Sequence, residues 1–446
     1  MACYSEASAR DQWPRPLAIE LSAPRHHRPW ALAALGLVAV ALVYGGLSSY
    51  SRVMGRGTDF NVFHLGGRLA VEAPEQLYEA QAPRGLHYTF IYPPLVGVLM
   101  WPLSALPLGP GAMVWFVVNV ACTLHAAWIL SRLLAPAGRT HVFFAAALVL
   151  ALPSTVENIM LGQLHALLLY LMVLTFAGLR RGRPATGAVA LGVATGIKLL
   201  PGILGVYFIV RRQWRALAVF VLTLIICSVA VPAVALGPRS AGALLGKFYE
   251  FRVAPYLSAE STQHPSYART AVRKTQHDHD LGAFLMRHFT DDHFIPGYER
   301  FVVAQFDLRV VRSAMYVLFA VMLVISVLTV WPDARNAAQE PGASDLAFCL
   351  FVILSSLLSP RSRVAYWTVF MIPWAVLLSR LMATQTAPRA WHVAAWTVGI
   401  SVTLCGLAIV PVFPGLTIGF WGQVVLWVGL LLLCRQERRA APAPQG

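Results

Sequence analysis

Residues 184–210 read PATGAVALGVATGIKLLPGILGVYFIV, an apolar stretch that is long enough to cross a membrane once. Arginines cluster at both of its ends: Arg180, Arg181 and Arg183 precede it, and Arg211, Arg212 and Arg215 follow it. Because arginine and lysine concentrate in cytoplasmic loops, both ends should lie on the cytoplasmic side, which a single crossing does not allow. The sequence therefore predicts that this stretch turns back within the membrane as a hairpin of two short helices.

The turn of the hairpin is predicted at Lys198-Leu199-Leu200-Pro201. Proline ends or kinks a helix, and irregular backbone inside a membrane is tolerated where it lines a cavity. Lys198 would then sit at the tip of the hairpin and face the interior of the protein. The alternative is one long tilted helix on which Lys198 extends its side chain to the membrane interface.

The whole chain is apolar, since 57% of its 446 residues are hydrophobic and 12% are charged. A soluble protein needs far more polar surface, so the composition indicates an all-α polytopic membrane protein. In addition to the hairpin, we predict about ten crossings of a hydrocarbon core of about 30 Å. The apolar runs lie near residues 30–50, 112–134, 141–160, 161–179, 215–237, 309–331, 344–359, 363–383, 390–411 and 416–434.

The formal net charge of +15 follows membrane topology rather than nucleic-acid binding. The arginine clusters fall on one side if the predicted crossings alternate, which places both termini in the cytoplasm. No nucleic-acid motif accompanies the charge, and the cysteines lack the spacing of a zinc site or a disulfide framework. We therefore expect cytoplasmic tails at residues 1–29 and 435–446, one transmembrane domain at 30–434, and no cofactor.

Two longer polar stretches, at about residues 51–111 and 238–308, are predicted to lie outside the membrane on the external side. Within the first, residues 61–72 and 91–104 are predicted to form short interfacial helices. Asp59 precedes them. An ionisable group at the mouth of a membrane bundle is costly to desolvate, which makes Asp59 a candidate functional residue. The alternative is a carboxylate that is simply solvated in the loop.

An ordered set of short motifs resembles glycosyltransferase family 87, which contains the polyprenyl-phosphate-mannose-dependent mannosyltransferases of bacteria. The resemblance runs from about residue 55 to about residue 380 and implies a bundle with a GT-C-like fold. The motifs, in chain order, are Thr58-Asp59-Phe60, Tyr78, Phe90-Ile91-Tyr92-Pro93-Pro94-Leu95, Trp101-Pro102-Leu103, Gly162-Gln163, Gly196-Ile197-Lys198-Leu199-Leu200-Pro201 and Leu358-Ser359-Pro360.

This resemblance implies a multi-pass enzyme of the inner (plasma) membrane whose active site faces the periplasm. It would move a sugar, first of all mannose, from a polyprenyl-phosphate donor to a lipid or glycan acceptor with inversion. Asp59 matches the family's catalytic aspartate, and one general base suffices because the phosphate leaves as a stable anion. Lys198, Arg361 and Arg363 would bind the donor phosphate. For the two arginines, predicted on the external side, snorkelling is the alternative.

The substrate pocket is predicted to include further polar side chains. Relatives usually carry a histidine after the Ser-Pro pair where this chain has Ala365 or Tyr366, and often an asparagine where it has His165. The histidines and aspartates of residues 277–280 alternate, and both ligate metals, but alternation points neighbours to opposite faces of a strand. We therefore favour a solvated or acceptor-contacting loop there and assign no metal ligand. The pocket candidates are His64, Tyr92, Gln163, His165, His279, Arg287 and Tyr366.

Two other classes of function stay open. A lipid or sugar transporter, or a flippase, would share the helices and the broken hairpin, but it would be expected to show internal repeats, and none is convincing in this sequence. A catalytically degenerate relative is favoured by the missing histidine, whereas the retained Asp59 argues against it. The sequence specifies neither the sugar, the acceptor, the length of the polyprenol nor the oligomeric state.

Overall fold

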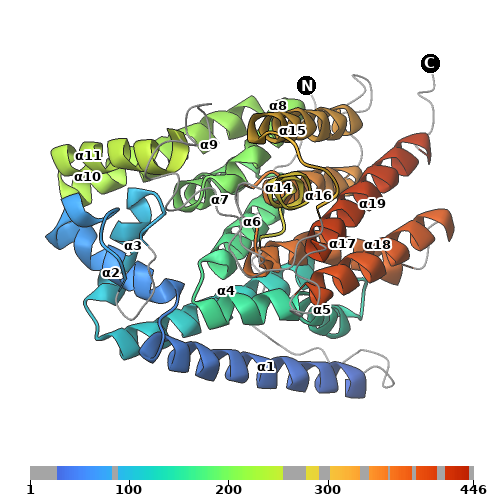
Figure 1. Ribbon diagram of the computed structural model, residues 1–446. Helices are drawn as coiled ribbons and strands as arrows, with labels where there is room; N and C mark the ends of the chain where they lie inside the picture. Colours follow the sequence, from blue (N-terminus) through green and yellow to red (C-terminus); the bar gives the residue numbers. More distant parts are fainter. Residues whose placement is uncertain are drawn as a thin grey trace, which may run out of the picture.

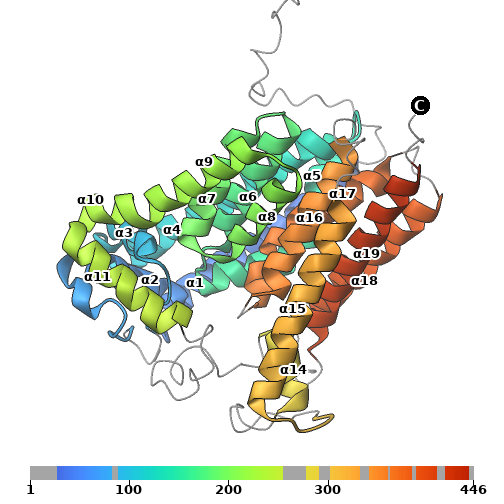
Figure 2. The same ribbon diagram turned by 90° about the horizontal axis from the view of Figure 1, so that it is seen from above.

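The computed structural model describes residues 28–82, 89–254, 278–290, 302–331, 341–359, 362–383, 388–408 and 417–440. Over these residues the fold is a bundle of helices, and the only extended pairing is an isolated bridge between Gln81 and Thr89. Long helices run roughly side by side through the molecule (Figures 1 and 2). The all-α fold class predicted from the composition is therefore confirmed.

Every predicted apolar run coincides with helical structure. Eight helical stretches of the described residues are long and apolar enough to cross a membrane, and α6 and α16 are shorter apolar helices. The run predicted at 215–237 is a helix interrupted by a π-turn. The helices of the bundle are α1 (Arg28–Met54), α4 (Leu108–Leu134), α5 (Thr140–Leu161), α6 (His165–Arg180), α9 (Trp214–Ile225) with its π-turn (Ile226–Ala230) and α10 (Val231–Leu236), α15 (Leu308–Val330), α16 (Pro341–Leu357), a 3-10 turn (Val364–Phe370) with α17 (Met371–Met382), α18 (Pro388–Leu407) and α19 (Ile418–Ala440).

The predicted hairpin is present as α7 (Pro184–Ile197), a 3-10 turn (Leu200–Leu204) and α8 (Gly205–Val210). Glycines fix its direction. Gly192 lies against Thr223 and Gly196 against Cys227, so α7 and α9 run parallel to each other. The intervening residues 198–213 must therefore carry the chain back, which excludes the alternative of one long tilted helix.

The two short helices predicted before the second crossing are also present, as α2 (Asp59–Glu72) and α3 (Pro94–Ser104). Thr58 caps α2: its side chain accepts a hydrogen bond from the Phe60 backbone N–H, and Asn61 accepts one from the Thr58 backbone N–H. The two helices approach each other closely at Gly67, where a Cβ atom would lie 2.7 Å from the Met100 backbone. This packing holds Asp59 rigidly at the first position of α2.

The stretch after α10, predicted to be external, contains more helix than the sequence suggested. It begins with α11 (Pro238–Phe248), which runs into a π-turn (Tyr249–Val253), and it later contains α14 (Leu281–Phe289). In Figure 2, α2, α3 and α11 lie together at the left of the molecule, whereas α14 lies at its lower edge beside α15. The site described below lies at the end of the bundle where α5 and α7 finish and α6 begins.

Ion pairs join helices at the opposite end of the bundle. Arg180 at the end of α6 lies 3.3 Å from the buried Asp345 of α16, and Arg380 of α17 pairs with Glu437 of α19. Partly buried pairs of this kind fix the contact of one helix with the next, because each charge is costly to bury alone.

Candidate functional site

The site is built around the sharp corner between α5 and α6. Gly162 ends α5 in the left-handed conformation, with φ of 66°, and a Cβ atom there would lie 2.7 Å from the Cβ atom of Phe60. The Trp115 indole N–H donates to the Gly162 carbonyl at 2.9 Å. Only glycine fits this position, and its close contact with Phe60 places the corner directly against the start of α2.

Gln163 connects this corner to Asp59. Its amide Nε2 donates to the Asp59 carboxylate Oδ2, and its Oε1 accepts a hydrogen bond of 3.1 Å from the Tyr92 hydroxyl. Burial raises the pKa of Tyr92, the nearby Asp59 carboxylate raises it further, and Arg363 lowers it. Tyr92 therefore stays protonated and acts as a donor. We call Asp59, Gln163 and Tyr92 the carboxylate side of the site.

His165, two residues further along the corner, contacts Lys198 at the tip of the hairpin. The Lys198 Nζ lies 2.8 Å from His165 Nε2 and 4.8 Å from the centre of the Tyr366 ring. The His165 and Tyr366 rings meet edge to face at 5.1 Å, and the Tyr366 hydroxyl lies 3.0 Å from Ser355 Oγ. An ammonium that donates to Nε2 requires a neutral imidazole. We call Lys198, His165 and Tyr366 the cation side.

Lys198 has no carboxylate within ion-pair distance in the parts of the chain that the structure describes. Its contacts are a neutral imidazole and an aromatic face. Asp59 and Arg363 lie within electrostatic range of it, the first attracting and the second repelling its charge. A partly buried ammonium with such partners is chemically suited to bind an anion.

Arg363 approaches the site from the start of the 3-10 turn that precedes α17. Its Nε lies 3.4 Å from Oδ1 of Asp278, a carboxylate that is completely buried. Arg363 also lies within electrostatic range of His165 and of Tyr92. Arg361, the other predicted phosphate-binding arginine, falls outside the described residues.

Three predicted pocket residues take other positions. The His64 Nε2 lies 2.9 Å from the Leu106 carbonyl and its ring packs on Phe60, so this histidine joins α2 to the loop before α4. The His279 ring packs against Trp367. Arg287 is buried and donates to the Asp278 carbonyl at 3.2 Å.

The alternating histidine and aspartate stretch is used for structure. The Asp280 carboxylate caps α14, accepting from the Ala283 backbone N–H at 2.8 Å, and also accepts from the Ser362 N–H at 3.2 Å. Asp278 pairs with Arg363, and His279 packs elsewhere. The described members of this stretch are buried and have different partners, so this part of the loop is not solvated as predicted, and its contact with an acceptor stays a prediction. His277 falls outside the described residues.

A sequence profile of glycosyltransferase family 87 matches residues 90–360, which is more than half of the chain. The chain belongs to glycosyltransferase family 87. This membership confirms the resemblance found in the sequence and makes the protein a membrane glycosyltransferase. The candidate residues of the α5–α6 corner and of the hairpin lie within the matched region.

Curated relatives of this family 87 protein come from mycobacteria. A polyprenol-phosphate-mannose-dependent alpha-(1-2)-phosphatidylinositol mannoside mannosyltransferase of Mycobacterium tuberculosis is 27% identical over 79% of this chain and 75% of its own length. Its counterpart in Mycolicibacterium smegmatis is 24% identical over 84% of this chain and 81% of its own length. An alpha-(1->3)-arabinofuranosyltransferase of M. tuberculosis is 32% identical over 34% of this chain and 36% of its own length.

Among solved structures, the chain is similar to ArnT from Cupriavidus metallidurans bound to undecaprenyl phosphate. The TM-score is 0.39 and the sequence identity 16%, with 92% of this chain and 78% of that chain covered.

One acidic residue near the site, Glu157, is not among the residues predicted from the sequence of this glycosyltransferase. Glu157 lies on α5, one turn before the corner, and is within electrostatic range of Asp59, Arg52 and Arg363. It stands inside the apolar run predicted at 141–160, so the rule that singled out Asp59 would also have found it.

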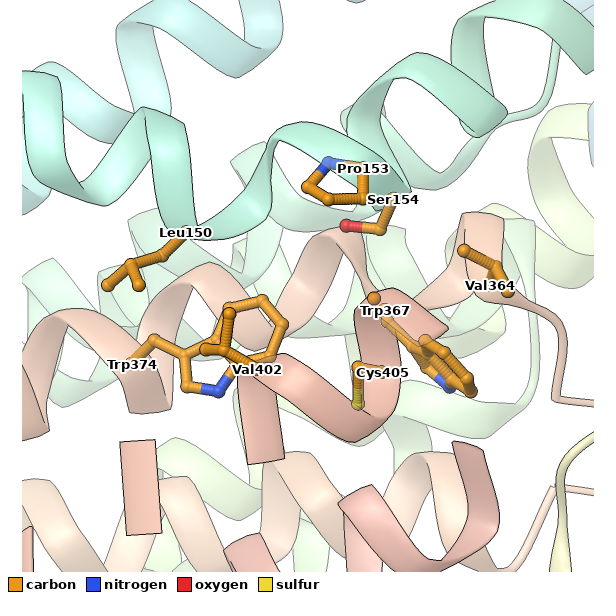
Figure 3. Close-up of a pocket in the computed structure, with 9 residues that line it drawn as sticks. Leu150, Pro153, Ser154, Val364, Trp367, Trp374, Val402 and Cys405 are labelled. Atoms are coloured by element: carbon orange, nitrogen blue, oxygen red, sulfur yellow. The ribbon is translucent and has the colours of Figure 1, made fainter. Parts of the chain in front are cut away.

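A small, mainly apolar pocket lies between α5, the segment leading into α17, and α18 (Figure 3). Trp367 and Trp374 face Leu150 and Pro153 across it, and Cys405 of α18 borders it. None of the predicted site residues lines this pocket. The carboxylate and cation sides of the glycosyltransferase are therefore separate from it.

Proposed function

We propose that this family 87 glycosyltransferase moves a sugar from a polyprenyl-phosphate donor to a hydroxyl of a lipid or glycan acceptor, with inversion at the anomeric carbon. Asp59 is the general base. The observation that carries this proposal is the pairing of two unlike groups at the α5–α6 corner. A carboxylate oriented by a neutral amide lies within electrostatic range of Lys198, an ammonium without a counter-ion among the described residues.

The chemistry needs both groups. The acceptor oxygen attacks the anomeric carbon from the face opposite the phosphate, and its proton passes to an Asp59 carboxylate oxygen. The bond between the anomeric carbon and the phosphate oxygen breaks, and its electron pair stays on that oxygen. The donor phosphodiester carries one negative charge and the departing polyprenyl phosphate gains a second, so a fixed cation stabilises the transition state more than the ground state.

We propose that Lys198 and Arg363 bind this phosphate. Both lie within electrostatic range of His165, which supports a shared site for the two cations. A charge-assisted hydrogen bond from ammonium or guanidinium to a phosphate oxygen is strong where water is scarce. Tyr366 limits the space around Lys198, since the centre of the Tyr366 ring lies 4.8 Å from the Lys198 Nζ atom.

We propose mannose as the transferred sugar, since the names of two of the relatives described above include polyprenol-phosphate-mannose dependence. The same names include a phosphatidylinositol mannoside, which makes a mannosylated phospholipid the first acceptor to test. The arabinofuranosyltransferase relative makes a pentose donor the second choice.

We further propose that the site faces the periplasm from the inner membrane. The arginine-rich end of the bundle, with Arg180 and Arg380, would then lie in the cytoplasm. Reporter proteins fused after residue 183 and after residue 212 should both report a cytoplasmic location, because the segment between them is a hairpin. A periplasmic signal at either position would contradict this orientation.

The proposed transfer is tested with purified protein in lipid, radiolabelled polyprenyl-phosphate sugars and candidate lipid acceptors. We expect labelled acceptor to appear with polyprenyl-phosphate mannose. A transporter would instead move the donor across sealed vesicles without forming product, and a degenerate relative would bind the donor without transfer. Either result, repeated with all donors and acceptors, would contradict the proposed function.

A further inference from the structure

The external segment that precedes α14 is bound to the segment that carries Arg363. The His279 backbone N–H donates to the Ser362 carbonyl at 2.7 Å, and the Ser362 N–H donates to Asp280 Oδ2 at 3.2 Å. The Gln423 side chain of α19 donates to the His279 carbonyl at 2.7 Å. These bonds hold both neighbours of the Asp278–Arg363 pair, so the register between the two segments is fixed.

Within this frame, Asp278 is the buried counter-ion of Arg363. Its side chain is completely buried and its Oδ1 lies 3.4 Å from Arg363 Nε, whereas 27% of the Arg363 side chain is exposed. Arg287, also buried, donates to the Asp278 carbonyl at 3.2 Å and fixes its backbone. A buried carboxylate without a cation is costly, so the pair restricts the guanidinium to the Asp278 side.

The pair matters for the site because Arg363 and Lys198 repel each other there. Burial is the main factor that disfavours the Lys198 ammonium, and Arg363 adds to it; Arg363 also lies within electrostatic range of Glu157 and Tyr92. Before an anion binds, two such cations in a poorly hydrated site would push apart. A carboxylate behind the guanidinium offsets that repulsion and keeps both cations in place.

We propose that Asp278 is a positioning residue, which holds the Arg363 guanidinium at the donor phosphate and supplies its counter-charge until the donor binds. The inference rests on the proposed function, because it presupposes that the site binds a lipid phosphate. Asp278 does not touch the substrate and acts through Arg363. It also gives the external stretch between α11 and α15 a direct role in donor binding.

A double-mutant cycle tests this role, with a fluorescent polyprenyl phosphate that carries no sugar as the probe. We expect Asp278→Asn to weaken binding of the probe by about tenfold, as for one partner of a charge pair that is removed. Arg363→Gln should weaken binding at least as much. The double variant should bind no worse than Arg363→Gln alone, because Asp278 has nothing left to position.

A purely structural role would give a different pattern. Asp278→Asn would then lower the melting temperature, and its effect on probe binding would be the same with arginine or glutamine at position 363. Asp345→Asn is the control, since Asp345 is a buried carboxylate that pairs with Arg180 at the opposite end of the bundle. Its effect on binding should add to that of Arg363→Gln. Coupling of Asp345→Asn as strong as that of Asp278→Asn would overturn the inference.

The remaining outcomes are also decisive. Where Asp278→Asn alone fails to fold, Asp278→Glu keeps the negative charge beside Arg363 and Arg287 but displaces the carboxylate, and it should weaken probe binding only while Arg363 is present. An equal effect in the Arg363→Gln background would contradict the pairing. Unchanged probe binding by a folded Asp278→Asn variant would overturn the inference while leaving the proposed function intact. No probe binding by the unmodified protein would instead contradict the proposed function.

Discussion

The carboxylate side and the cation side of the site hold their charges in different ways. Asp59 is hydrogen-bonded to the neutral amide of Gln163 and stands at the first position of α2. Lys198 contacts only a neutral imidazole and an aromatic ring among the described residues. The Asp59 charge is hydrogen-bonded to Gln163, whereas the Lys198 charge has contacts that leave it suited to bind an anion.

This difference separates the two tasks of the site. A carboxylate paired with Lys198 would compete with the phosphate for the ammonium. We therefore expect changes on the carboxylate side to affect the rate of transfer and changes on the cation side to affect donor affinity.

The largest effect is expected for Asp59→Asn. Asparagine keeps the shape of the side chain but does not accept a proton, so turnover should fall by about 10² or more while donor affinity is nearly unchanged. Single-turnover transfer and donor titration measure the two quantities separately. Glu72→Gln, at the exposed end of the same helix, is the control and should leave both unchanged. A folded Asp59→Asn variant that transfers sugar at a near-native rate would end the assignment.

Lys198→Met should lower donor affinity rather than turnover. Loss of the ammonium removes a charge-assisted hydrogen bond, so donor binding should weaken by about 1–3 kcal/mol with the fold intact. Lys247→Met is the matched control, because Lys247 is an external lysine on α11 that pairs with the exposed Glu79 at 2.7 Å. Unchanged affinity for Lys198→Met, or an equal loss for the control, would remove the phosphate assignment.

Gln163→Met tests whether the amide orients the base. Methionine fills similar space without the amide, which leaves Asp59 and Tyr92 without this partner. The loss should cost about 1 kcal/mol, or roughly fivefold in single-turnover rate. Combined with Asp59→Asn it should cost nothing further, since Gln163 acts through Asp59. A loss of the same size in both backgrounds would show that Gln163 contacts the substrate directly.

The smallest effect is expected for Tyr92→Phe, which removes only the hydroxyl that donates to Gln163. We expect a twofold to threefold lower rate, equivalent to about 0.5 kcal/mol, and unchanged donor affinity. Steady-state kinetics at saturating donor measure this difference. A loss of rate larger than that of Gln163→Met would contradict the proposed order of hydrogen bonds, in which Tyr92 acts on Asp59 through Gln163.

The sequence predicted the bundle and the hairpin because both follow from local properties. Apolar length identifies a membrane helix, and arginines at both ends of residues 184–210 reveal the reversal. It also singled out Asp59 and Lys198, since an ionisable residue among apolar ones is visible without any structure. Helix α11 was not predicted, because its polar sequence carries no comparable signal.

The partners of the site residues could not be predicted in the same way. His64 lies five residues after Asp59, yet its contacts are with Leu106 and Phe60, which depends on how α2 packs against the loop before α4. The pairing of Asp278 with Arg363 joins residues far apart in the chain and depends on the docking of the external segment. Sequence spacing carries no information about such contacts.

A structure of the Asp59→Asn variant with donor and acceptor both bound tests the central claim most directly, because this variant should hold the complex without turning it over. We predict that the side chain at position 59 lies within about 3 Å of the acceptor hydroxyl, on the face of the sugar opposite the phosphate. We also predict that Lys198 contacts a phosphate oxygen. An acceptor hydroxyl next to another side chain, with position 59 beyond hydrogen-bond reach, would contradict the assignment of Asp59 as the general base.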